Sequence, residues 1–480
     1  NSDENILLVQ QNGKNNDIDY EAAIRYNSNN NILAAQQNGT ANEIYEIYVQ
    51  NKSNENIVAA QQNGKNNYIE YVGVGEKSNS NIVAARQSGK GNYMYDVYAW
   101  EKSDENLVIA EQNGKNNYME YVGAAYSSDK NIIYAGQNGK GNYAEVYAED
   151  NSDENTIAAE QNGRNNDAYV YADDKSDNNL LGSQQNGRGN YVTNDITIKS
   201  DYNLSFSQQN GRNNYMNIDI EDKSDYNAIV AQQNGKGNDA DDVGAYYNSD
   251  YNLFAFQQNG TRNELDYFEV YDDSNNNALI GQQNGKDNYA DVQVYDESNY
   301  NLLTFQQNGK RNDLDYFGVD DDSNYNALIV QQNGRANYAY LNTWDESDNN
   351  LSVLQQNGKR NTMDYIEIYD KSDFNAVFAQ QNGKDNYADI QIWNKSDKNL
   401  VALRQTGDSN KSTSYIVRKS DKNLALVEQV GTKNKSRLRV RGNSDKNSVI
   451  VSQNGQKNKA FNKVVQDSNK NSIFTVQQGS

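Results

Sequence analysis

A closing glycine recurs along the whole 480-residue chain at steps of 24 to 26 residues, from Gly13 to Gly479. These glycines mark twenty copies of one unit, each with Asn eight, Gln two and Ser eleven residues earlier; all nineteen complete copies have Asn three residues later. A fixed period in this range is typical of solenoids and other stacked arrays. The repeat outweighs the composition, since a net charge of -22 and a mean hydropathy of -1.03 alone would indicate disorder.

The unit S-[DN]-x-N-x5-Q-x-G-x2-N is followed by an arm of variable length. From its first Asn to its Gln the unit has seven residues, which is the length of a strand and too short for a stable helix. Aliphatic residues share the parity of the fixed amides, as in Asn56, Val58, Ala60 and Gln62. The second arm alternates from Asn288 onward. Each unit is therefore expected to form strand, turn, strand, turn.

The fixed amides favour a parallel stack over an antiparallel meander. In-register stacking places each Asn and Gln about 4.7 to 4.8 Å from its own copy, so that the side-chain amides bond along the stack as ladders. A meander gives no reason for identity at every level. The predicted ladder positions are Asn5, Gln11, Gly13, Asn16, Asn56, Gln62, Gly64, Asn67, Asn131, Gln137, Gly139, Asn142, Asn227, Gln233, Gly235, Asn238, Asn326, Gln332, Gly334, Asn337, Asn447, Gln453, Gly455 and Asn458.

The glycine fits a position that needs a positive φ or a close backbone approach at every level. In a stack, Asn12-Gly13 is better interpreted as a bend between two sheets than as a hairpin turn. We therefore predict an all-β, two-sheet parallel β-solenoid of about 19.5 stacked units.

The pattern N-x5-Q-x-G-x2-N-x-[AIM], present at Asn131, Gln137, Gly139, Asn142 and Ala144, resembles the curlin repeat of the major curli subunit, a bacterial functional amyloid of biofilm matrix. The resemblance covers essentially the whole chain. It implies a β-solenoid that is secreted unfolded through an outer-membrane channel, is nucleated by a minor subunit and assembles head to tail into extracellular cross-β fibres that support adhesion.

The chain also departs from that family. Curlin repeats usually carry a second Gln nine residues after the glycine, where this chain has Ala22, Tyr48, Gly73 or Val294. It also has many more repeats than the familiar subunit, so it resembles a long-chain relative.

Charge is arranged by position in the unit. Lys or Arg follows the closing glycine in fourteen of nineteen complete copies, and Asp follows the fixed Ser in thirteen of twenty. If the two turns lie on opposite edges, one edge carries cations and the other carboxylates, which either keep the chain soluble or bundle fibres in a salt-dependent way.

The charge also changes along the chain, which divides it into residues 1–404, with acidic regular repeats, and residues 405–480, with basic divergent repeats ending in a half repeat. Residues 401–480 carry 15 Lys or Arg and 5 Asp or Glu, a net +10; subtraction from the totals of 44 and 66 leaves 29 and 61, a net -32, for residues 1–400. Ser412 and Ser436 there replace apolar residues expected to face inward. The basic end is expected to meet the acidic start of another copy, or else an anionic surface or extracellular DNA without sequence specificity.

Tyr often follows the second fixed Asn, as at Tyr68, Tyr93 and Tyr118, where its parity points outward. Exposed Tyr ladders and outward apolar residues such as Ile57 and Ile82 indicate a face that either packs laterally between fibres or is merely tolerated at the surface.

Catalysis has little support, because the chain lacks His and Cys. Acidic runs such as Asp320–Asp322 match no calcium-loop motif, so we expect no metal or cofactor. We expect a mature secreted chain with no membrane span and with uncapped ends, which favour head-to-tail stacking of copies. The alternative is a monomeric secreted β-solenoid stalk or adhesin that binds a surface glycan or ice.

Overall fold

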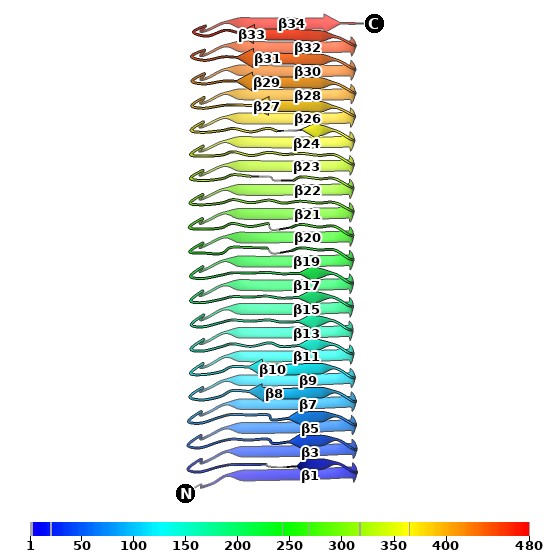
Figure 1. Ribbon diagram of the computed structural model, residues 1–480, viewed down its shortest axis with the longest axis vertical. Helices are drawn as coiled ribbons and strands as arrows, with labels where there is room; N and C mark the ends of the chain where they lie inside the picture. The colour runs from blue at the N-terminus through cyan, green and yellow to red at the C-terminus, as the bar shows by residue number, and fades with distance from the viewer. Residues whose placement is uncertain are drawn as a thin grey trace. The chain divides into compact units, whose positions relative to one another are not determined.

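The computed structural model describes residues 3–19, 22–241, 243–266, 268–315, 318–363 and 365–479, apart from the side chain of Asp19. These residues form two compact units, Asn1–Gly237 and Asn238–Ser480. Among the described residues the regular secondary structure is β-strand throughout, and the paired strands run parallel. The predicted fold class is confirmed: each unit is a parallel β-solenoid (Figure 1).

In the first unit, one nine-residue strand begins directly after the first fixed Asn of every copy. These long strands are β1(Ile6–Lys14), β3(Ile32–Thr40), β5(Ile57–Lys65), β7(Ile82–Lys90), β9(Leu107–Lys115), β11(Ile132–Lys140), β13(Thr156–Arg164), β15(Leu180–Arg188), β17(Leu204–Arg212) and β19(Ala228–Lys236). Each pairs in register with the same strand of the next copy, for example Gln37 with Gln62. Identical residues therefore lie above one another, about 4.8 Å apart.

The return arms of the first unit form a second parallel sheet of nine short strands. These are β2(Asp17–Asp19), β4(Glu43–Tyr45), β6(Tyr68–Glu70), β8(Tyr93–Tyr98), β10(Tyr118–Gly123), β12(Tyr143–Ala144), β14(Asp167–Ala168), β16(Tyr191–Val192) and β18(Tyr215–Met216).

The second unit repeats the long sheet with β20(Leu253–Thr261), β21(Ala278–Lys286), β22(Leu302–Lys310), β23(Ala327–Arg335), β24(Leu351–Lys359), β26(Ala376–Lys384), β28(Leu400–Asp408), β30(Leu424–Thr432), β32(Ser448–Gln456) and β34(Ser472–Gln478). Its return sheet has five strands, β25(Thr362–Met363), β27(Tyr387–Gln391), β29(Lys411–Ile416), β31(Lys435–Val440) and β33(Lys459–Val464).

The return arm is less regular than the predicted second strand. Among the described residues of 238–361 it forms no named strand, and its sheet pairing there is a single bridge from Tyr338 to Thr362. Successive closing glycines from Gly260 to Gly383 are 25, 24, 25, 24 and 25 residues apart, so neighbouring arms differ in length. From Gly383 onward every step is 24, and the return strands reach five to six residues. Equal spacing alone does not produce a long return strand, because the steps of 24 residues from Gly139 to Gly235 go with return strands of only two residues.

The core lies between the long sheet and the return arms. Burial alternates along the long strands, with residues such as Val58 and Val83 fully enclosed and their sequence neighbours half-exposed. Return-arm residues such as Ile69 and Met94 meet them from the other side. This alternation places the parity of the fixed amides inside.

The interpretation of Asn12-Gly13 as the bend between sheets is wrong. Gly13 lies within β1, which continues to Lys14. The bend comes one residue later, at Asn15, which has a left-handed φ of 53°. The equivalent residue, two after the glycine, has a positive φ in the other complete copies too, whether it is Asn66, Gly91 or Arg262. The chain therefore turns at the residue before the second fixed Asn.

Candidate functional site: the stacking interface

The central Gln forms an unbroken hydrogen-bonded column within each unit. In the first unit the Nε2 of Gln11 donates to Oε1 of Gln37, and the same bond recurs at each level up to Gln233, at 2.8 to 3.0 Å. In the second unit the column runs from Gln258 to Gln477 at 2.7 to 2.9 Å. Each bond joins two levels through buried or part-buried amides.

The second hydrogen of the Gln amide ties the two sheets together. Nε2 of Gln62 donates to the backbone carbonyl of Glu43 at 2.8 Å, and Nε2 of Gln137 donates to that of Tyr118 at 2.9 Å. The carbonyl belongs to the residue after the second fixed Asn of the preceding level. One side chain thus holds three levels and both sheets in register.

The first fixed Asn forms a second column at the entrance to the long strand. Nδ2 and the backbone N–H of Asn56 donate to Oδ1 of Asn31, and Nδ2 also donates to the carbonyl of Ser78 at 2.8 Å. The same backbone bond is found at Asn131, Asn227 and Asn447. At Asn326 the backbone bond to the preceding Asn is kept at 2.8 Å, but Nδ2 finds no partner among the described residues.

The second fixed Asn secures the bend after the long strand. The backbone N–H of Asn67 donates to Oδ1 of Asn42, while Nδ2 of Asn67 reaches the carbonyls of Asn63 and Gly89 at 3.3 Å. The remaining predicted positions of this column make or receive the equivalent backbone bond: Asn16, Asn142, Asn238, Asn337 and Asn458.

The closing glycine is required by both conformation and space. The φ values of Gly64, Gly139, Gly235, Gly334 and Gly455 lie between 105° and 131°. A Cβ on Gly139 would lie 2.0 Å from the carbonyl oxygen of Gly163, and one on Gly334 would lie 2.0 Å from that of Gly358. Gly13 has the same geometry. No other residue fits in this column, because successive backbones meet there directly.

The ladder residues of the first level are more exposed to solvent than those of the interior levels. Gln11 and Gly13 are exposed, and Asn5 and Asn16 are part-buried, because β1 pairs with a long strand on one side only among the described residues. Leu7 has the core parity but is 51% exposed, whereas Leu33, its partner in β3, is fully buried.

Two further columns of hydrogen-bonded side chains, the fixed Ser and the Asp or Asn that follows it, are not among the ladder positions predicted from the sequence. The fixed Ser is buried: Oγ of Ser53 accepts from the backbone N–H of Ser78 and donates to the carbonyl of Gly75. The Asp or Asn that follows the Ser accepts from the preceding level, as when Oδ1 of Asp129 accepts from the N–H of Asp104 at 2.6 Å. The signal was present, since Ser and [DN] are as regular in the sequence as the chosen amides.

These Asp side chains are therefore structural as well as charged. Burial raises the pKa of Asp129, the hydrogen bond from the backbone N–H of Asp104 partly offsets that rise, and the charges of Asp153 and Asp104 add to it. Stacked carboxylates at one 4.8 Å spacing repel one another, so the column costs more with each consecutive Asp.

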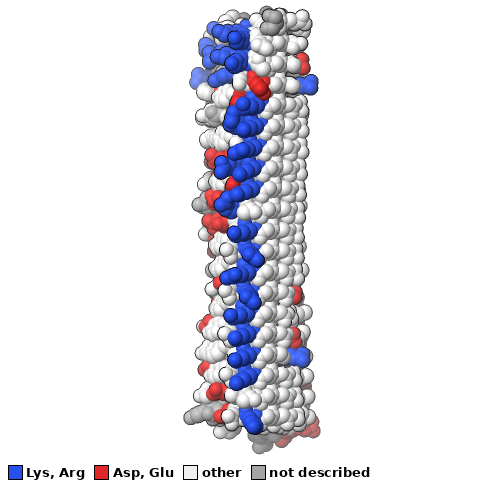
Figure 2. Space-filling view, turned by 90° about the vertical axis from the view of Figure 1, so that its right-hand side faces the viewer, with Lys and Arg blue, Asp and Glu red and all other residues white. Residues whose placement is uncertain are grey.

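The cations lie where the sequence pattern placed them, at the far end of the long strand. Within each unit they gather in a narrow stripe, and the surface beside it is mostly uncharged (Figure 2). In the first unit Arg164, Arg188 and Arg212 line one shallow groove with the adjoining glycines. The Asp after the fixed Ser lies before the opposite end of the strand, so the two kinds of charge occupy opposite edges.

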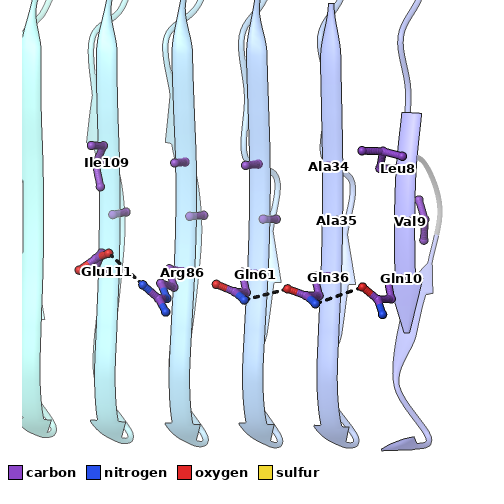
Figure 3. A pocket seen from close by; sticks show the side chains of 15 residues that line it. Leu8, Val9, Gln10, Ala34, Ala35, Gln36, Gln61, Arg86, Ile109 and Glu111 are labelled. Atoms are coloured by element: carbon purple, nitrogen blue, oxygen red, sulfur yellow. Dashed lines mark hydrogen bonds and ion pairs between the residues drawn. The ribbon is translucent and has the colours of Figure 1, made fainter. Parts of the chain in front are cut away.

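The outer face of the long sheet carries its own amide ladder. In the first unit Nε2 of Gln36 donates to Oε1 of Gln10, and Gln61 donates to Gln36 (Figure 3). The ladder is interrupted where Arg86 faces Glu111 at 3.9 Å, and it resumes from Gln184 to Gln232. A shallow groove of about 570 Å³ runs beside it, lined by Ala34, Ala59, Ala84 and their neighbours.

The Tyr residues after the second fixed Asn stack along the first unit's return sheet. Ring centroids are 4.9 Å apart for Tyr68 and Tyr93, and 5.0 Å apart for Tyr93 and Tyr118. These rings are part-buried, and burial beside Glu70 raises the pKa of Tyr93 to about 12. The sequence predicted an exposed ladder of Tyr rings, whereas in the structure these rings are partly buried. The curlin-type second Gln position faces inward, since Tyr48 and Val294 are buried there.

The acidic run at Asp320–Asp322 contributes to one small cluster. Carboxylate oxygens of Asp320, Asp321 and Asp345 lie within 4.8 Å of one another, and two of these residues are exposed. Exposed acidic groups commonly lie this close without an ion, so we assign no metal to them.

Comparison with known proteins does not assign this chain to a family. A scan against protein-family models finds no match, and neither does a search of curated proteins. Within the described part of the chain, no helix has the length and apolar character needed to cross a bilayer.

Proposed function

We propose that this chain is a structural subunit of extracellular, curli-like amyloid fibres, which assemble head to tail by β-strand stacking and support biofilm matrix and adhesion. The observation that carries the proposal is the uniform level-to-level interface. Every level offers the next one the same Asn, Gln and Ser donors and acceptors, as at Gln62 and Gln87. A junction between two copies needs no chemistry that the chain does not already use.

The free energy of pairing the side-chain amides favours stacking of one copy of the chain on another. A buried amide left without its partner costs about 1 to 3 kcal/mol, and each level carries three amide columns. The amides of the exposed first level are in reach of water, and stacking a copy on them would exchange that water for the same ladder partners that the interior levels have. The resemblance to curlin repeats supplies the remaining proposed partners, a minor nucleator subunit and an outer-membrane secretion channel. Nucleic acid would bind only without sequence specificity.

The test is imaging and fibre diffraction of the purified chain. We expect unbranched fibres with a meridional spacing of about 4.7 to 4.8 Å. Discrete rods of one chain length, at concentrations that saturate assembly, would overturn the proposal and favour the stalk or adhesin that binds a glycan or ice.

A matched pair of variants in β1 sharpens the test. Leu7 and Ile6 are 51% and 47% exposed, but only Leu7 has the parity that is buried in interior levels. Leu7→Lys should slow fibre elongation at least about tenfold, because stacking would bury an unpaired charge. Ile6→Lys should elongate normally. Equal elongation of both variants would contradict stacking through β1.

A further inference from the structure

The long sheet of the first unit ends in an unbroken column of cations, part of the blue stripe in Figure 2. In eight consecutive levels, from Lys65 to Lys236, the residue after the closing glycine is Lys or Arg. Each pairs in register with the next, so their Cα atoms follow one another at about 4.8 Å. All eight are exposed, and none forms an ion pair with another described residue.

The surroundings of this cation column are uncharged. From the residue before the closing glycine to the second fixed Asn, its neighbours in the chain are Asn, Ser and Gly. The nearest carboxylates on the same strands belong to Glu111 and Glu160, four residues before the cation and therefore about 13 Å away along the strand. That distance exceeds the Debye length of about 8 Å at physiological salt. Beyond the bend, Glu70 accepts hydrogen bonds from the hydroxyls of Tyr68 and Tyr93.

The opposite edge of the same levels carries both signs of charge. There Lys175, Lys199 and Lys223 stand before the fixed Ser, but an Asp follows that Ser in each case, as at Asp177. The fields of neighbouring opposite charges largely cancel at a distance. Only the edge at the end of the long strands therefore presents a single sign of charge over many levels.

A groove runs along the middle of the cation column. Arg164, Arg188 and Arg212, with the glycines before them, line a shallow hollow of about 410 Å³. Because the glycines have no side chain, the floor is backbone, and the guanidinium groups stand beside it. A guanidinium group can hold a carboxylate through two parallel hydrogen bonds. The groove therefore offers an anionic chain both a bed and a regular set of partners.

We propose that the cation column binds a linear acidic polysaccharide, with one uronate residue at each level. The sugar chain lies along the stack above the glycines, and its carboxylates contact the Lys and Arg side chains. Like charges about 4.8 Å apart repel one another, and carboxylates placed between them relieve that repulsion. The whole column belongs to one chain, so the proposal does not depend on stacking of copies.

The shape and spacing of the column favour this ligand over nucleic acid. A chain of 1,4-linked hexuronates is extended, carries one carboxylate per ring and advances by about the height of one level per ring. Phosphates of double-stranded DNA wind around the duplex axis and leave a straight column within a fraction of a turn. Single strands gain much of their affinity from bases that stack on aromatic side chains. The nearest rings, Tyr68, Tyr93 and Tyr118, already stack on one another at 4.9 to 5.0 Å.

Two triple variants of the full chain remove the same charge from the same levels. The site variant combines Arg164→Gln, Arg188→Gln and Arg212→Gln. The control variant combines Lys175→Gln, Lys199→Gln and Lys223→Gln on the opposite edge. All six side chains are exposed, and stacked Gln can form an amide ladder, so circular dichroism should show an unchanged fold in both variants.

The probe is an end-labelled octamer of 1,4-linked galacturonate. Its methyl ester serves as the uncharged counterpart, and an oligothymidylate of the same length represents nucleic acid. Binding is measured by fluorescence anisotropy for discrete rods and by loss of label from the supernatant for sedimented fibres. The measurement thus works in either state of assembly, so a failure of fibre formation and a failure of polysaccharide binding are distinguishable.

We expect the unmodified chain to bind the octamer but not its ester. With the single-strand value of about 0.7 per contact, eight contacts give a slope of log affinity against log salt of about -6, and the four contiguous cations kept by the site variant, Lys65 to Lys140, give about -3. At about 50 mM salt the site variant should bind at least about tenfold more weakly, and the control variant within about twofold of the unmodified chain. Equal binding by the two variants, binding of the ester, or tighter binding of the oligothymidylate than of the octamer would overturn the inference.

Discussion

The central Gln column predicts that two adjacent glutamines have very different effects. Gln62 is fully buried and takes part in three hydrogen bonds: Nε2 donates to Gln87 and to the carbonyl of Glu43, and Oε1 accepts from Gln37. Its neighbour Gln61 faces outward, is part-buried and donates to Gln36 at 2.8 Å. Both side chains have the same composition and lie on the same strand.

The expected cost follows from the groups that each substitution leaves behind. Gln62→Ala strands one amide hydrogen of Gln37 and the carbonyl of Gln87 in the core, at about 1 to 3 kcal/mol each, for a total of about 2 to 6 kcal/mol. Gln61→Ala leaves its partners in reach of water, so it should cost about 0.5 to 1.5 kcal/mol. At the midpoints of these ranges the two variants should differ by about 3 kcal/mol.

Hydrogen exchange of backbone amides measures this cost level by level. In a solenoid each level contacts only its neighbours, so the loss should be concentrated in β3, β5 and β7. Since about 1.4 kcal/mol is a factor of ten, a difference of about 3 kcal/mol should speed exchange there about a hundredfold in Gln62→Ala relative to Gln61→Ala. Equal protection in both variants would refute the claim that buried amide columns hold the levels together.

Three further predictions concern other columns. Gly163 has a φ of 130°, and an added Cβ would lie 1.9 Å from a carbonyl oxygen, so Gly163→Ala should lower the free energy of unfolding by more than about 3 kcal/mol, as measured by hydrogen exchange. Gly141 has a φ of 65°, which Asn tolerates, so Gly141→Asn should lower it by less than about 1 kcal/mol. Ser412→Ala should stabilise by about 1 kcal/mol in thermal melts, since its buried hydroxyl lacks a partner among the described residues. Ser372→Ala should destabilise, because the Ser372 hydroxyl accepts from the N–H of Ser396 and donates to the carbonyl of Trp393. Burial, with Glu70, Glu120 and Glu46, raises the pKa of Asp96 to about 7. The folded state thus binds this proton more tightly than the unfolded chain, and stability should fall as the pH rises from about 4 to 7; Asp96→Asn should flatten that slope in melts recorded across this range.

The sequence predicted the parts of the fold that depend on identical residues. Parallel register and the inward parity of Asn56 and Gln62 follow from amides repeated at fixed spacing, because only an in-register stack uses that identity. The position of the bend did not follow. Asn-Gly is a strong turn signal in antiparallel hairpins, but here the glycine's positive φ serves the close approach of strands, and Asn15 makes the turn.

The return arm was harder to predict for a physical reason. Its residues vary and its length changes, so no column of identical side chains fixes its register. A strand of six residues forms at Tyr93–Tyr98, yet the described arms near Tyr289 form none. The Ser and Asp columns were missed because only the amides and the glycine were chosen as ladder positions. In the structure the Ser hydroxyl accepts a hydrogen bond from the next level, and the Asp carboxylate accepts one from the preceding level.

Side-chain size explains why the apolar rows alternate while the amide rows do not. An amide is thin enough to repeat at about 4.8 Å, and each copy gains a hydrogen bond by doing so. A Phe ring in the core overlaps the adjacent level unless it stacks. At Gly281 an added Cβ would lie 2.5 Å from the ring of Phe305, so the ring occupies space that the glycine leaves open. On the outer face of the second unit the same constraint alternates Leu302 with Ile329 between two rows. A stack that must fit its own repeat thereby acquires a corrugated outer surface, because large side chains at one level are offset from those at the next.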